Sequence, residues 1–451
     1  MTLSTATAPS RALLALAEAR VPRYTSYPTA AQFGPLDEAA LRGWLREGVR
    51  PGMPLSLYLH VPFCREMCWY CACHTKATRS EARVATFADA LEAEAALLAA
   101  ALPGHGGVSH LHFGGGTPSI LGPARMRSVM ASLRSRFGLR AAAEVAIELD
   151  PRTLDEPMVE TLASLGFTRA SLGVQDISPE VQARIGRIQP AEMVAVAADR
   201  LRAAGLGGLN IDLMYGLPGQ TVAHVEASAR FVSWLGADRV AVFGYAHVDW
   251  MKPHQKAIDA ATLPGVEERM EQAEAAEAVL TAAGYVALGL DHFARPEDPL
   301  ARAAAAGGLR RNFQGYTTDD APALIGLGPS AIGTLPGGHA QNLLDERAYA
   351  AAVAEGRLPV ARGVALTEED RWRSRAIERL MCDFALDLGL VPPGALPAAL
   401  ERMEPLAERG LVRVGDGRVE VTSMGRRFVR QVAACFDAYL APAARRHSSA
   451  V

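Results

Sequence analysis

The sequence predicts an α/β protein whose parallel strands form a wide, incomplete barrel around a bound ligand. Six strand-like segments alternate with alanine-rich, helix-like stretches, and this alternation is typical of parallel strands joined by right-handed crossovers. Such a chain builds either a barrel or an open doubly wound sheet. The polarity of the side chains within the strands favours the incomplete barrel, and the cysteines of one loop indicate what it binds.

The six strand-like segments are short and rich in β-branched and aliphatic residues. They are residues 55–61, 110–114, 144–150, 169–175, 209–215 and 240–245. A seventh candidate strand, residues 285–293, follows a long helical stretch. No sequence repeat at a fixed period is visible. The region is therefore predicted to be one α/β unit.

Side chains alternate in polarity along these segments, because successive residues of a strand point to opposite faces. In residues 55–61 the leucines share one face, and Ser56, Tyr58 and His60 share the other. The same alternation gives one polar face that carries His112, Glu148, Gln175 and Asp212. A closed eight-stranded barrel fills its interior with branched apolar residues, so this face favours a wider barrel with a ligand inside. A solvated outer face is the alternative, but it is rare in parallel sheets.

Two segments flank the predicted barrel, which spans residues 51–365. The N-terminal arm, residues 1–50, contains a proline- and tyrosine-rich run at 22–28 that cannot be helical throughout. Residues 366–451 form a C-terminal, mostly helical domain with a hairpin pattern around a glycine turn, which is typical of a winged-helix-like fold. Such folds often bind DNA, but the segment has no concentrated basic face. We expect it to pack onto the barrel.

Composition and charge describe a globular protein without affinity for polyanions or membranes. Apolar residues make up 49% of the chain, and the net charge of −3 offers no field that would gather nucleic acid. No segment reaches the ~20 consecutive apolar residues of a membrane span. The apolar run at 12–17 ends at Glu18 and is expected to form an amphipathic surface helix. We therefore expect a cytoplasmic protein with reduced cysteines, of which Cys382 and Cys435 are small buried residues.

The other four cysteines are packed into one short loop as Cys64-x3-Cys68-x2-Cys71-x-Cys73. Three thiolates at spacings of x3 and x2 can reach three irons of a four-iron cluster, which leaves the fourth iron open for a chelating ligand. The loop follows the first strand, at the carboxyl end where barrel enzymes keep their sites. Zinc is the alternative. Structural zinc usually takes two cysteine pairs, or one pair with later histidines, and no second pair exists here. A zinc site completed by His74 would be strained, because all four ligands would come from one short stretch of chain. We therefore expect an iron–sulfur cluster.

A glycine run, Gly114-Gly115-Gly116-Thr117-Pro118, ends the second strand. Alone, such a run would be only a turn. It lies at the same barrel end as the cysteine loop, however, and glycines let a ligand touch the backbone directly. We expect its carbonyls to bind the amino group of an aminoacyl ligand.

Together these motifs resemble the oxygen-independent coproporphyrinogen III oxidases. The resemblance rests on the cysteine quartet and residues 58–64, 114–118, 148–152, 210–218, 244–247, 291–296 and 311–318. It runs from the arm at 23–28 to the carboxyl terminus, and it implies a partial, six-stranded radical S-adenosylmethionine barrel with a helical C-terminal domain. The implied reaction is oxidative decarboxylation of two propionates of coproporphyrinogen III, giving protoporphyrinogen IX in haem synthesis. Because an unactivated carbon–hydrogen bond is beyond side-chain acids and bases, a deoxyadenosyl radical would take the hard step.

The resemblance also implies residues for each cofactor. Cys64, Cys68 and Cys71 would bind the 4Fe-4S cluster, and two S-adenosylmethionine molecules would bind per chain. Contacts to the cluster-bound molecule would come from Tyr58, Gly115, Glu148 and Ile332. Contacts to the second molecule would come from Tyr70, Cys73, Gly116, Thr117, Gln175, Arg187, Asp212 and Ala246. The residues implied as catalytic are Tyr58, His60, Cys73 and Gln314.

The implied partners are coproporphyrinogen III and a flavodoxin- or ferredoxin-type electron donor, and the implied enzyme is a monomer. Tyr70 stands where phenylalanine is expected, which keeps a stacking surface and leaves the role of its hydroxyl open. The second hypothesis is a haem-binding chaperone of the same superfamily. Those relatives lack the Cys-x-Cys ending, the arm at 23–28 and the motif at 311–318, all of which are present here. A plain electron-transfer ferredoxin is disfavoured by the size of the chain.

Overall fold

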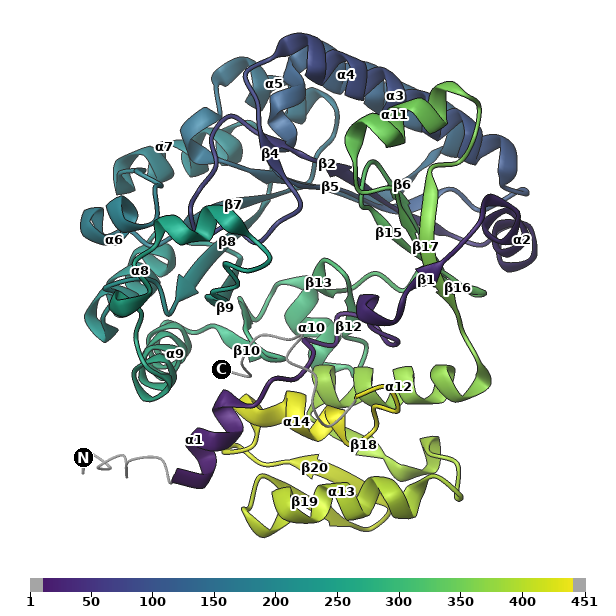
Figure 1. Cartoon of the computed structure of the whole chain (residues 1–451). Coiled ribbons are helices and arrows are strands. Elements are labelled where there is room, and N and C mark those ends of the chain that lie inside the picture. The colour runs from purple at the N-terminus through teal and green to yellow at the C-terminus, as the bar shows by residue number, and fades with distance from the viewer. Residues whose placement is uncertain (1–10, 441–451) are drawn as a thin grey trace.

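Six parallel strands form the centre of the molecule, in the computed structural model that describes residues 11–440 (Figure 1). The strands are β2 (Leu55–Val61), β5 (Val108–Gly115), β6 (Leu139–Leu149), β7 (Arg169–Gln175), β8 (Gly208–Tyr215) and β9 (Arg239–Gly244). They lie in the sheet in chain order, and each pairs in parallel with the next. The predicted alternation and all six predicted strands are thereby confirmed.

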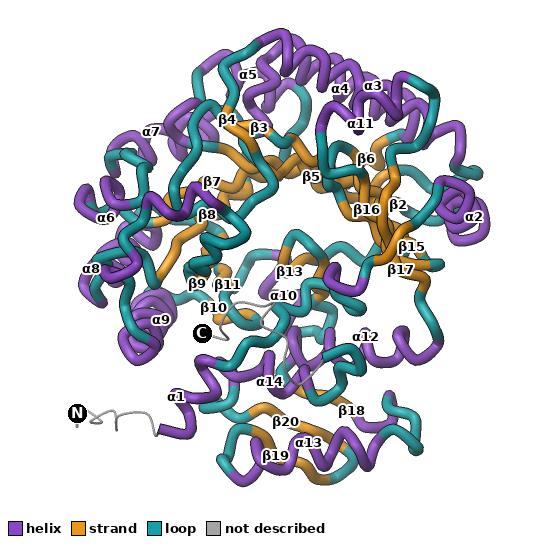
Figure 2. Tube along the Cα trace, viewed as in Figure 1, coloured by secondary structure: helices purple, strands orange, loops and turns teal. Residues whose placement is uncertain are grey.

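Helices cover the outer face of this curved sheet (Figures 1 and 2). They are α3 (Glu81–Ala101), α4 (Gly122–Phe137), α5 (Glu156–Ser164), α6 (Pro179–Arg184), α7 (Ala191–Ala203), α8 (Val222–Trp234) and α9 (Val266–Ala282). The apolar face of the strands packs against them in one large core that includes Leu57, Leu111, Ile147 and Ile211, all buried. The opposite face lines an internal cavity, as the alternation of side chains predicts.

The sheet does not close into a barrel. On one side β2 pairs with β14 (Ala323–Leu327), and an antiparallel meander continues the sheet outward. The meander consists of β15 (Ile332–Leu335), β16 (Gly338–Asn342) and β17 (Val360–Ala365), with β1 (Gly34–Pro35) at the edge. On the other side β9 pairs with a hairpin of β11 (His292–Ala294) and β10 (Val286–Leu288). The incomplete barrel is therefore confirmed.

The prediction of one strand over residues 285–293 is wrong, because this segment folds back on itself as the β10–β11 hairpin. Gly289 in the turn has a φ of +53°, in the left-handed region that glycine adopts at little cost. A Cβ at this position would also overlap the ring of Tyr316. A tertiary contact therefore decides where the strand breaks.

The C-terminal domain has the expected order of helices and hairpin. It contains α12 (Glu368–Asp383), β18 (Ala385–Asp387), α13 (Leu396–Glu408), β19 (Val412–Gly415), β20 (Arg418–Val421) and α14 (Val429–Ala434). Strand β18 joins the predicted hairpin in a three-stranded sheet of order β18-β20-β19. Arg427 donates a hydrogen bond of 3.0 Å to the carbonyl of Met270 in α9, so the domain packs onto the barrel as expected.

The N-terminal arm is shared between two apolar cores. Helix α1 (Arg11–Glu18), together with Tyr24 and Tyr27, packs into the core of the C-terminal domain. Helix α2 (Glu38–Gly48) packs into the barrel core through Leu41 and Leu45. The predicted arm covers residues 1–50, of which 1–10 lie outside the described residues, and we propose that residues 11–50 tie the two cores together. We also propose a domain boundary near residue 365, between the end of β17 and the first residues of the second core.

Shorter elements complete the connections. They are β3 (Phe63–Cys64), β4 (Lys76–Ala77), α10 (Pro299–Ala305), β12 (Arg310–Asn312), β13 (Gly315–Thr317) and α11 (Glu346–Ala354). Strands β3 and β4 pair and flank the cysteine loop, and β12 and β13 form a hairpin near the inner opening of the barrel (Figure 1). Over residues 11–440, no helix is long and apolar enough to cross a membrane.

A buried carboxyl holds the loop between β14 and β15. Glu94 in α3 is 1% exposed, and burial raises its pKa to about 7. Its oxygens accept hydrogen bonds from Gly328 N at 2.7 Å, from Asn342 Nδ2 at 2.6 Å and from the Tyr349 hydroxyl at 2.6 Å. Because β14 pairs with β2, this network also fixes the strand that leads into the cysteine loop.

Glu94→Ala should destabilise the fold, because it leaves three buried donors without an acceptor at a cost of about 1–3 kcal/mol each before relaxation. We expect the unfolding free energy in urea to fall by roughly 3 kcal/mol. Asp89→Ala, which removes an exposed acid from the same helix, is the control and should change it by less than about 0.5 kcal/mol. Equal urea midpoints for wild type and Glu94→Ala would contradict the role given to this carboxyl.

Candidate active site

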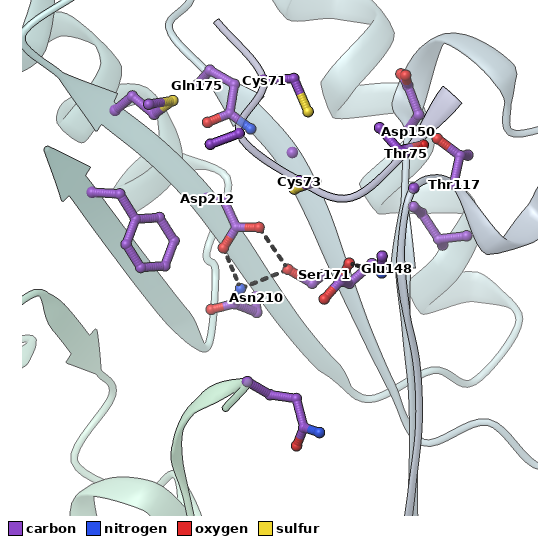
Figure 3. A pocket seen from close by; sticks show the side chains of 18 of the residues that line it. Cys71, Cys73, Thr75, Thr117, Glu148, Asp150, Ser171, Gln175, Asn210 and Asp212 are labelled. Carbon is purple, nitrogen blue, oxygen red and sulfur yellow. Dashed lines mark hydrogen bonds between the residues drawn. The ribbon is translucent and has the colours of Figure 1, made fainter. Parts of the chain in front are cut away.

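The polar face of the strands lines a cavity of about 680 Å³, and the cysteine loop lines the same cavity (Figure 3). Most residues nominated from the sequence meet there. They are Cys64, Cys68, Tyr70, Cys71, Cys73, Gly115, Gly116, Thr117, Glu148, Gln175, Arg187, Asp212, Ala246 and Gln314. Residues from five strands and from the loops that connect distant parts of the chain are thus brought to one space. Tyr58, His60 and Ile332 do not line it.

The cysteine loop has little regular structure between β3 and β4, and a distant segment, Lys252 with the 3-10 helix Pro253–Ala257, holds its backbone. Lys252 Nζ, His254 Nε2 and Gln255 Nε2 each lie 2.7–2.9 Å from a carbonyl oxygen of the cysteine loop. These carbonyls belong to Cys73, Cys71 and Tyr70, respectively. The contacts to Cys71 and Tyr70 are partly buried, and the contact to Cys73 is exposed. The three side chains therefore fix the path of the loop and with it the positions of the thiols.

The sulfur of Cys68 lies among positive charges. Arg152 Nη2 and Arg187 Nη1 donate to it at 3.4 and 3.3 Å. Asp150 binds both arginines, at 2.7 and 3.3 Å, and keeps their guanidinium groups in place. Burial alone would raise the pKa of Asp150, but the hydrogen bond and charge of the two arginines lower it overall. Two cationic N–H donors therefore lie beside the Cys68 sulfur.

The other loop sulfurs also have hydrogen-bond partners. Thr117 Oγ1 donates to Cys64 Sγ at 3.4 Å, and Thr75 Oγ1 lies at the same distance. Burial raises the pKa of the Cys64 thiol despite these contacts. A hydrogen bond between Cys71 and Cys73 lowers the pKa of Cys71 to about 7 and raises that of Cys73. Cys71 is therefore the more acidic thiol of this pair, and Cys73 is its donor.

This donor set fits an iron–sulfur cluster. Three thiols of one loop line a common cavity, with guanidinium and hydroxyl groups beside them. Hydrogen bonds to sulfur stabilise thiolates and tune the potential of such clusters. Among the described residues, no three His, Cys, Asp or Glu side chains are gathered closely enough to hold a single metal ion.

The glycine turn at the end of β5 packs tightly against its neighbours. Gly115 has a φ of +107°, and a Cβ there would lie 2.7 Å from the His60 ring. A Cβ on Gly116 would overlap the carbonyl of Phe63. The amide of Gly116 donates to Val61 O at 2.8 Å. Close approach to β2 and β3 is therefore one reason for these glycines, in addition to the ligand contact that the sequence suggests.

Glu148, at the end of β6, faces the cavity as a carboxylate. Its Oε2 accepts a hydrogen bond from Gly115 N at 3.0 Å, and its Oε1 pairs with His112 Nε2 at 3.2 Å. Burial raises the pKa of Glu148, but the hydrogen bonds and the charge of His112 outweigh burial and lower it overall. Glu148 therefore carries its charge at neutral pH.

Asp212 on β8 is the second carboxyl of the cavity and has only neutral hydrogen-bond partners. Ser171 Oγ donates to it at 3.1 Å, and Asn210 Nδ2 donates to it at 2.9 Å (Figure 3). Burial, with the nearby charge of Glu148, raises the pKa of Asp212 to about 6. The two carboxyls are thus held at different pKa values within one cavity.

Tyr58 and His60 lie on β2 and connect it to the cysteine loop. The Tyr58 hydroxyl donates to His60 Nδ1 at 3.1 Å, and His60 Nε2 donates to the carbonyl of His74 at 2.8 Å. Burial lowers the pKa of His60, so its ring is neutral with the proton on Nε2. Ile332 begins β15, and its backbone packs against Gly326 of β14.

Several residues of the site were not nominated from the sequence. They are Asp150, Arg152, Ser171, Asn210 and the three side chains of residues 252–255. Ser171 and Asn210 share the strand parity of Gln175 and Asp212, so the same alternation extended along β7 and β8 finds them. Residues 252–255 reach the cysteine loop across 179 to 185 positions of chain, and no local pattern signals that contact.

Comparison with known proteins agrees with this site. Residues 58–232 match the model of the radical SAM superfamily. An oxygen-independent coproporphyrinogen III oxidase of Bradyrhizobium diazoefficiens is 48% identical, over 96% of this chain and 98% of its own. Another of that name from Escherichia coli is 39% identical over 94% of each chain. The solved structure of coproporphyrinogen III oxidase from Escherichia coli, described as a radical SAM enzyme, matches 93% of this chain and 98% of its own with a TM-score of 0.89.

The similarity extends over nearly the whole chain, from the arm to the C-terminal domain, and it includes the loop that carries the cysteines. It favours the enzyme over the haem-binding chaperone, because the relatives that match at this level are named as oxidases. The chain therefore belongs to the oxygen-independent coproporphyrinogen III oxidases, within the radical SAM superfamily.

Proposed function

We propose that this chain catalyses the oxygen-independent oxidative decarboxylation of coproporphyrinogen III to protoporphyrinogen IX in haem synthesis. The names of its relatives point to this substrate. The observation that carries the proposal is a single cavity that joins three closely spaced cysteine thiols to a row of polar strand residues. Anaerobic incubation of the iron-reconstituted protein with coproporphyrinogen III, S-adenosylmethionine and a reductant should yield the divinyl product. Stoichiometric haem binding without any conversion would instead support the chaperone.

The cofactors of this family are a 4Fe-4S cluster and S-adenosylmethionine, which when bound supply the radical that no side chain can generate. Cys64, Cys68 and Cys71 would hold the cluster. Arg152 and Arg187 donate to the Cys68 sulfur, and they would stabilise the thiolate and fix its direction. The surrounding strands orient the substrate and exclude water from the reacting carbon.

We further propose two S-adenosylmethionine molecules per chain. Gly115 and Glu148, which line the cavity, would contact the cluster-bound molecule together with Tyr58 and Ile332, which do not line it. The second molecule would be contacted by residues that all line the cavity: Tyr70, Cys73, Gly116, Thr117, Gln175, Arg187, Asp212 and Ala246. This second group of residues is large and surrounds the same cavity from several strands. Its size supports the binding of a second molecule.

The roles of His60 and Gln314 follow from their contacts. His60 touches Tyr58 and the His74 carbonyl and does not line the cavity, so we assign it a positioning role. Gln314 lines the cavity, and its buried Nε2 has no hydrogen-bond partner among the described residues. An unpartnered buried donor is costly unless a ligand satisfies it. We propose that Gln314 donates to a bound ligand.

Electron supply would come from a flavodoxin- or ferredoxin-type donor in the cytoplasm, to an enzyme that acts as a monomer. The exposure of the cysteine loop supports an external donor, because Trp69, next to Cys68, is 38% exposed. Because the cysteine loop lies near the protein surface, electrons would have a short path from the donor to the cluster.

Replacing Cys64, Cys68 or Cys71 with alanine should each abolish the cluster. Wild-type protein reconstituted without oxygen should bind about four iron per chain with the broad absorption of a four-iron cluster, and each variant should lose both. Cys382→Ala and Cys435→Ala remove buried thiols far from the loop in sequence, and they should keep the full iron content. A zinc-loaded protein that is active without iron would overturn this assignment.

Cys73→Ser should separate turnover from cluster assembly. The Cys73 thiol donates to Cys71, and a fourth thiolate on iron would occupy the position that S-adenosylmethionine needs. The serine variant should therefore keep full iron content while vinyl formation falls by about two orders of magnitude or more. Loss of iron together with activity would show that Cys73 is a ligand.

Asp212→Asn should change the pH dependence of stability. The pKa of Asp212 is about 6 in the folded chain and about 3.8 when unfolded, so its ionisation costs folded stability as the pH rises from 4 through 6. At pH 7.5 we expect the cofactor-free variant to be more stable than wild type, by on the order of 1–2 kcal/mol. In melting curves this advantage should shrink steadily towards pH 4. An advantage of the same size at pH 7.5 and at pH 4.5 would contradict the raised pKa.

A further inference from the structure

A small second cavity adjoins the active-site cavity at the carboxyl end of β9. Its volume is about 70 Å³. Arg23, Gly244, Tyr245 and Ala246 line both cavities, which makes the two continuous neighbours. The four cysteines of the loop line only the larger cavity.

The second cavity is strongly basic. The arginines that line it are Arg23, Arg269, Arg427 and Arg430. Only two acidic residues, Glu277 and Asp291, also line it. Each already has a partner: Glu277 pairs with Arg427 at 3.2 Å, and Asp291 pairs with His292 at 2.7 Å. The lining residues therefore leave an excess of positive charge around the cavity.

Arg269, on α9, has no carboxylate partner among the described residues. Its guanidinium lies 5.5 Å from the centre of the Tyr215 ring. Two glycines leave room for it: a Cβ on Gly244 would lie 3.1 Å from Nη2, and a Cβ on Gly216 would overlap Nη1. Burial, with the like charge of Arg23, lowers the pKa of Arg269. The half-buried side chain is thus packed in place without a carboxylate counter-charge.

Arg23 is fixed at the border between the two cavities. Arg311 Nη2 donates to the carbonyl of Arg23 at 3.2 Å, and Arg430 Nε donates to the carbonyl of Pro22 at 3.0 Å. The Arg23 side chain itself reaches Gly244 O at 3.1 Å. Over residues 11–440 no carboxylate forms an ion pair with Arg23. Arg311 and Arg430 thus hold the backbone at residues 22–23, and the Arg23 guanidinium lies at the border between the two cavities.

We propose that the second cavity binds a carboxylate of the tetrapyrrole substrate, with Arg23 and Arg269 as its ligands. This inference rests on the proposed function, whose substrate loses two propionates as vinyl groups and keeps the others. An alkyl carboxylate fits the cavity volume, suits the paired donors of a guanidinium and supplies the missing counter-charge. Because none of the loop cysteines lines this cavity, the carboxylate held there is a retained one, remote from the reacting carbon.

The test measures binding of mesoporphyrinogen IX, which has ethyl groups in place of the reacting propionates and keeps the other two. Anaerobic equilibrium dialysis compares this diacid with its dimethyl ester on the iron-reconstituted protein. Wild type should bind the diacid roughly tenfold or more tightly than the ester. Arg269→Gln and Arg23→Gln should each lose most of this preference, with unchanged iron content and S-adenosylmethionine affinity. Arg230→Gln, at an exposed arginine that pairs with Glu226, is the matched control and should keep it.

Two outcomes would overturn the inference. An undiminished preference for the diacid in both cavity variants would place the carboxylate elsewhere. A loss of S-adenosylmethionine affinity with the preference intact would assign the cavity to the carboxylate of that cofactor. Failure of the proposed function looks different, because wild type itself would then neither convert coproporphyrinogen III nor prefer the diacid. Arg269→Lys, which keeps the charge and loses the planar pair of donors, should restore part of the preference.

Discussion

The site depends on how the irregular loop at residues 65–75 is held by hydrogen bonds to its backbone carbonyls. The cysteine loop has no strand partner along most of its length, so side chains from elsewhere in the fold hold its backbone. His60 on β2 and the side chains of residues 252–255 provide the donors. Side chains of the barrel therefore set the positions of the cysteine thiols. A change in the 252–255 loop acts on the cluster site without touching a ligand.

The barrel interior combines charge with burial by pairing nearly every ionic group. Asp150 is matched by two arginines, and Glu148 is matched by His112 and a backbone amide. Of these three carboxyls, only Asp212, whose partners are all neutral, has a raised pKa. This pairing lowers the free-energy cost of burying charged groups inside the barrel, and burial of the outer apolar core offsets what remains. Gln314 Nε2 has no hydrogen-bond partner among the described residues, and the Arg269 guanidinium has no carboxylate partner there, so these two groups point to ligands.

Side-chain alternation was enough to predict six strands, their polar face and the convergence of Glu148, Gln175 and Asp212 on one cavity. These features are local, because parity along a strand decides which face a residue occupies. The parts that could not be predicted depend on distant contacts. Tyr316 fills the space beside Gly289 and breaks the expected seventh strand, and Glu94 finds Asn342 across 248 positions. The position of Arg23 beside the second cavity also depends on distant contacts. The motif at residues 22–28 predicts an ordered arm, but it does not indicate which residues lie next to that arm.

The C-terminal domain has the helices and hairpin expected of a winged-helix-like fold, and its contacts are to the arm and the barrel. Its core takes in Tyr24 and Tyr27 of the arm, and the Tyr24 hydroxyl donates to Asp437 at 2.9 Å. Arg430, from α14, holds the carbonyl of Pro22. The barrel holds the other side of the arm, where His339 Nε2 donates to Tyr27 O at 3.2 Å. The barrel and the C-terminal domain both bind the same short segment of the arm, so Arg23 has a fixed position beside the cavity. The C-terminal domain therefore contributes to the site by holding the arm in place.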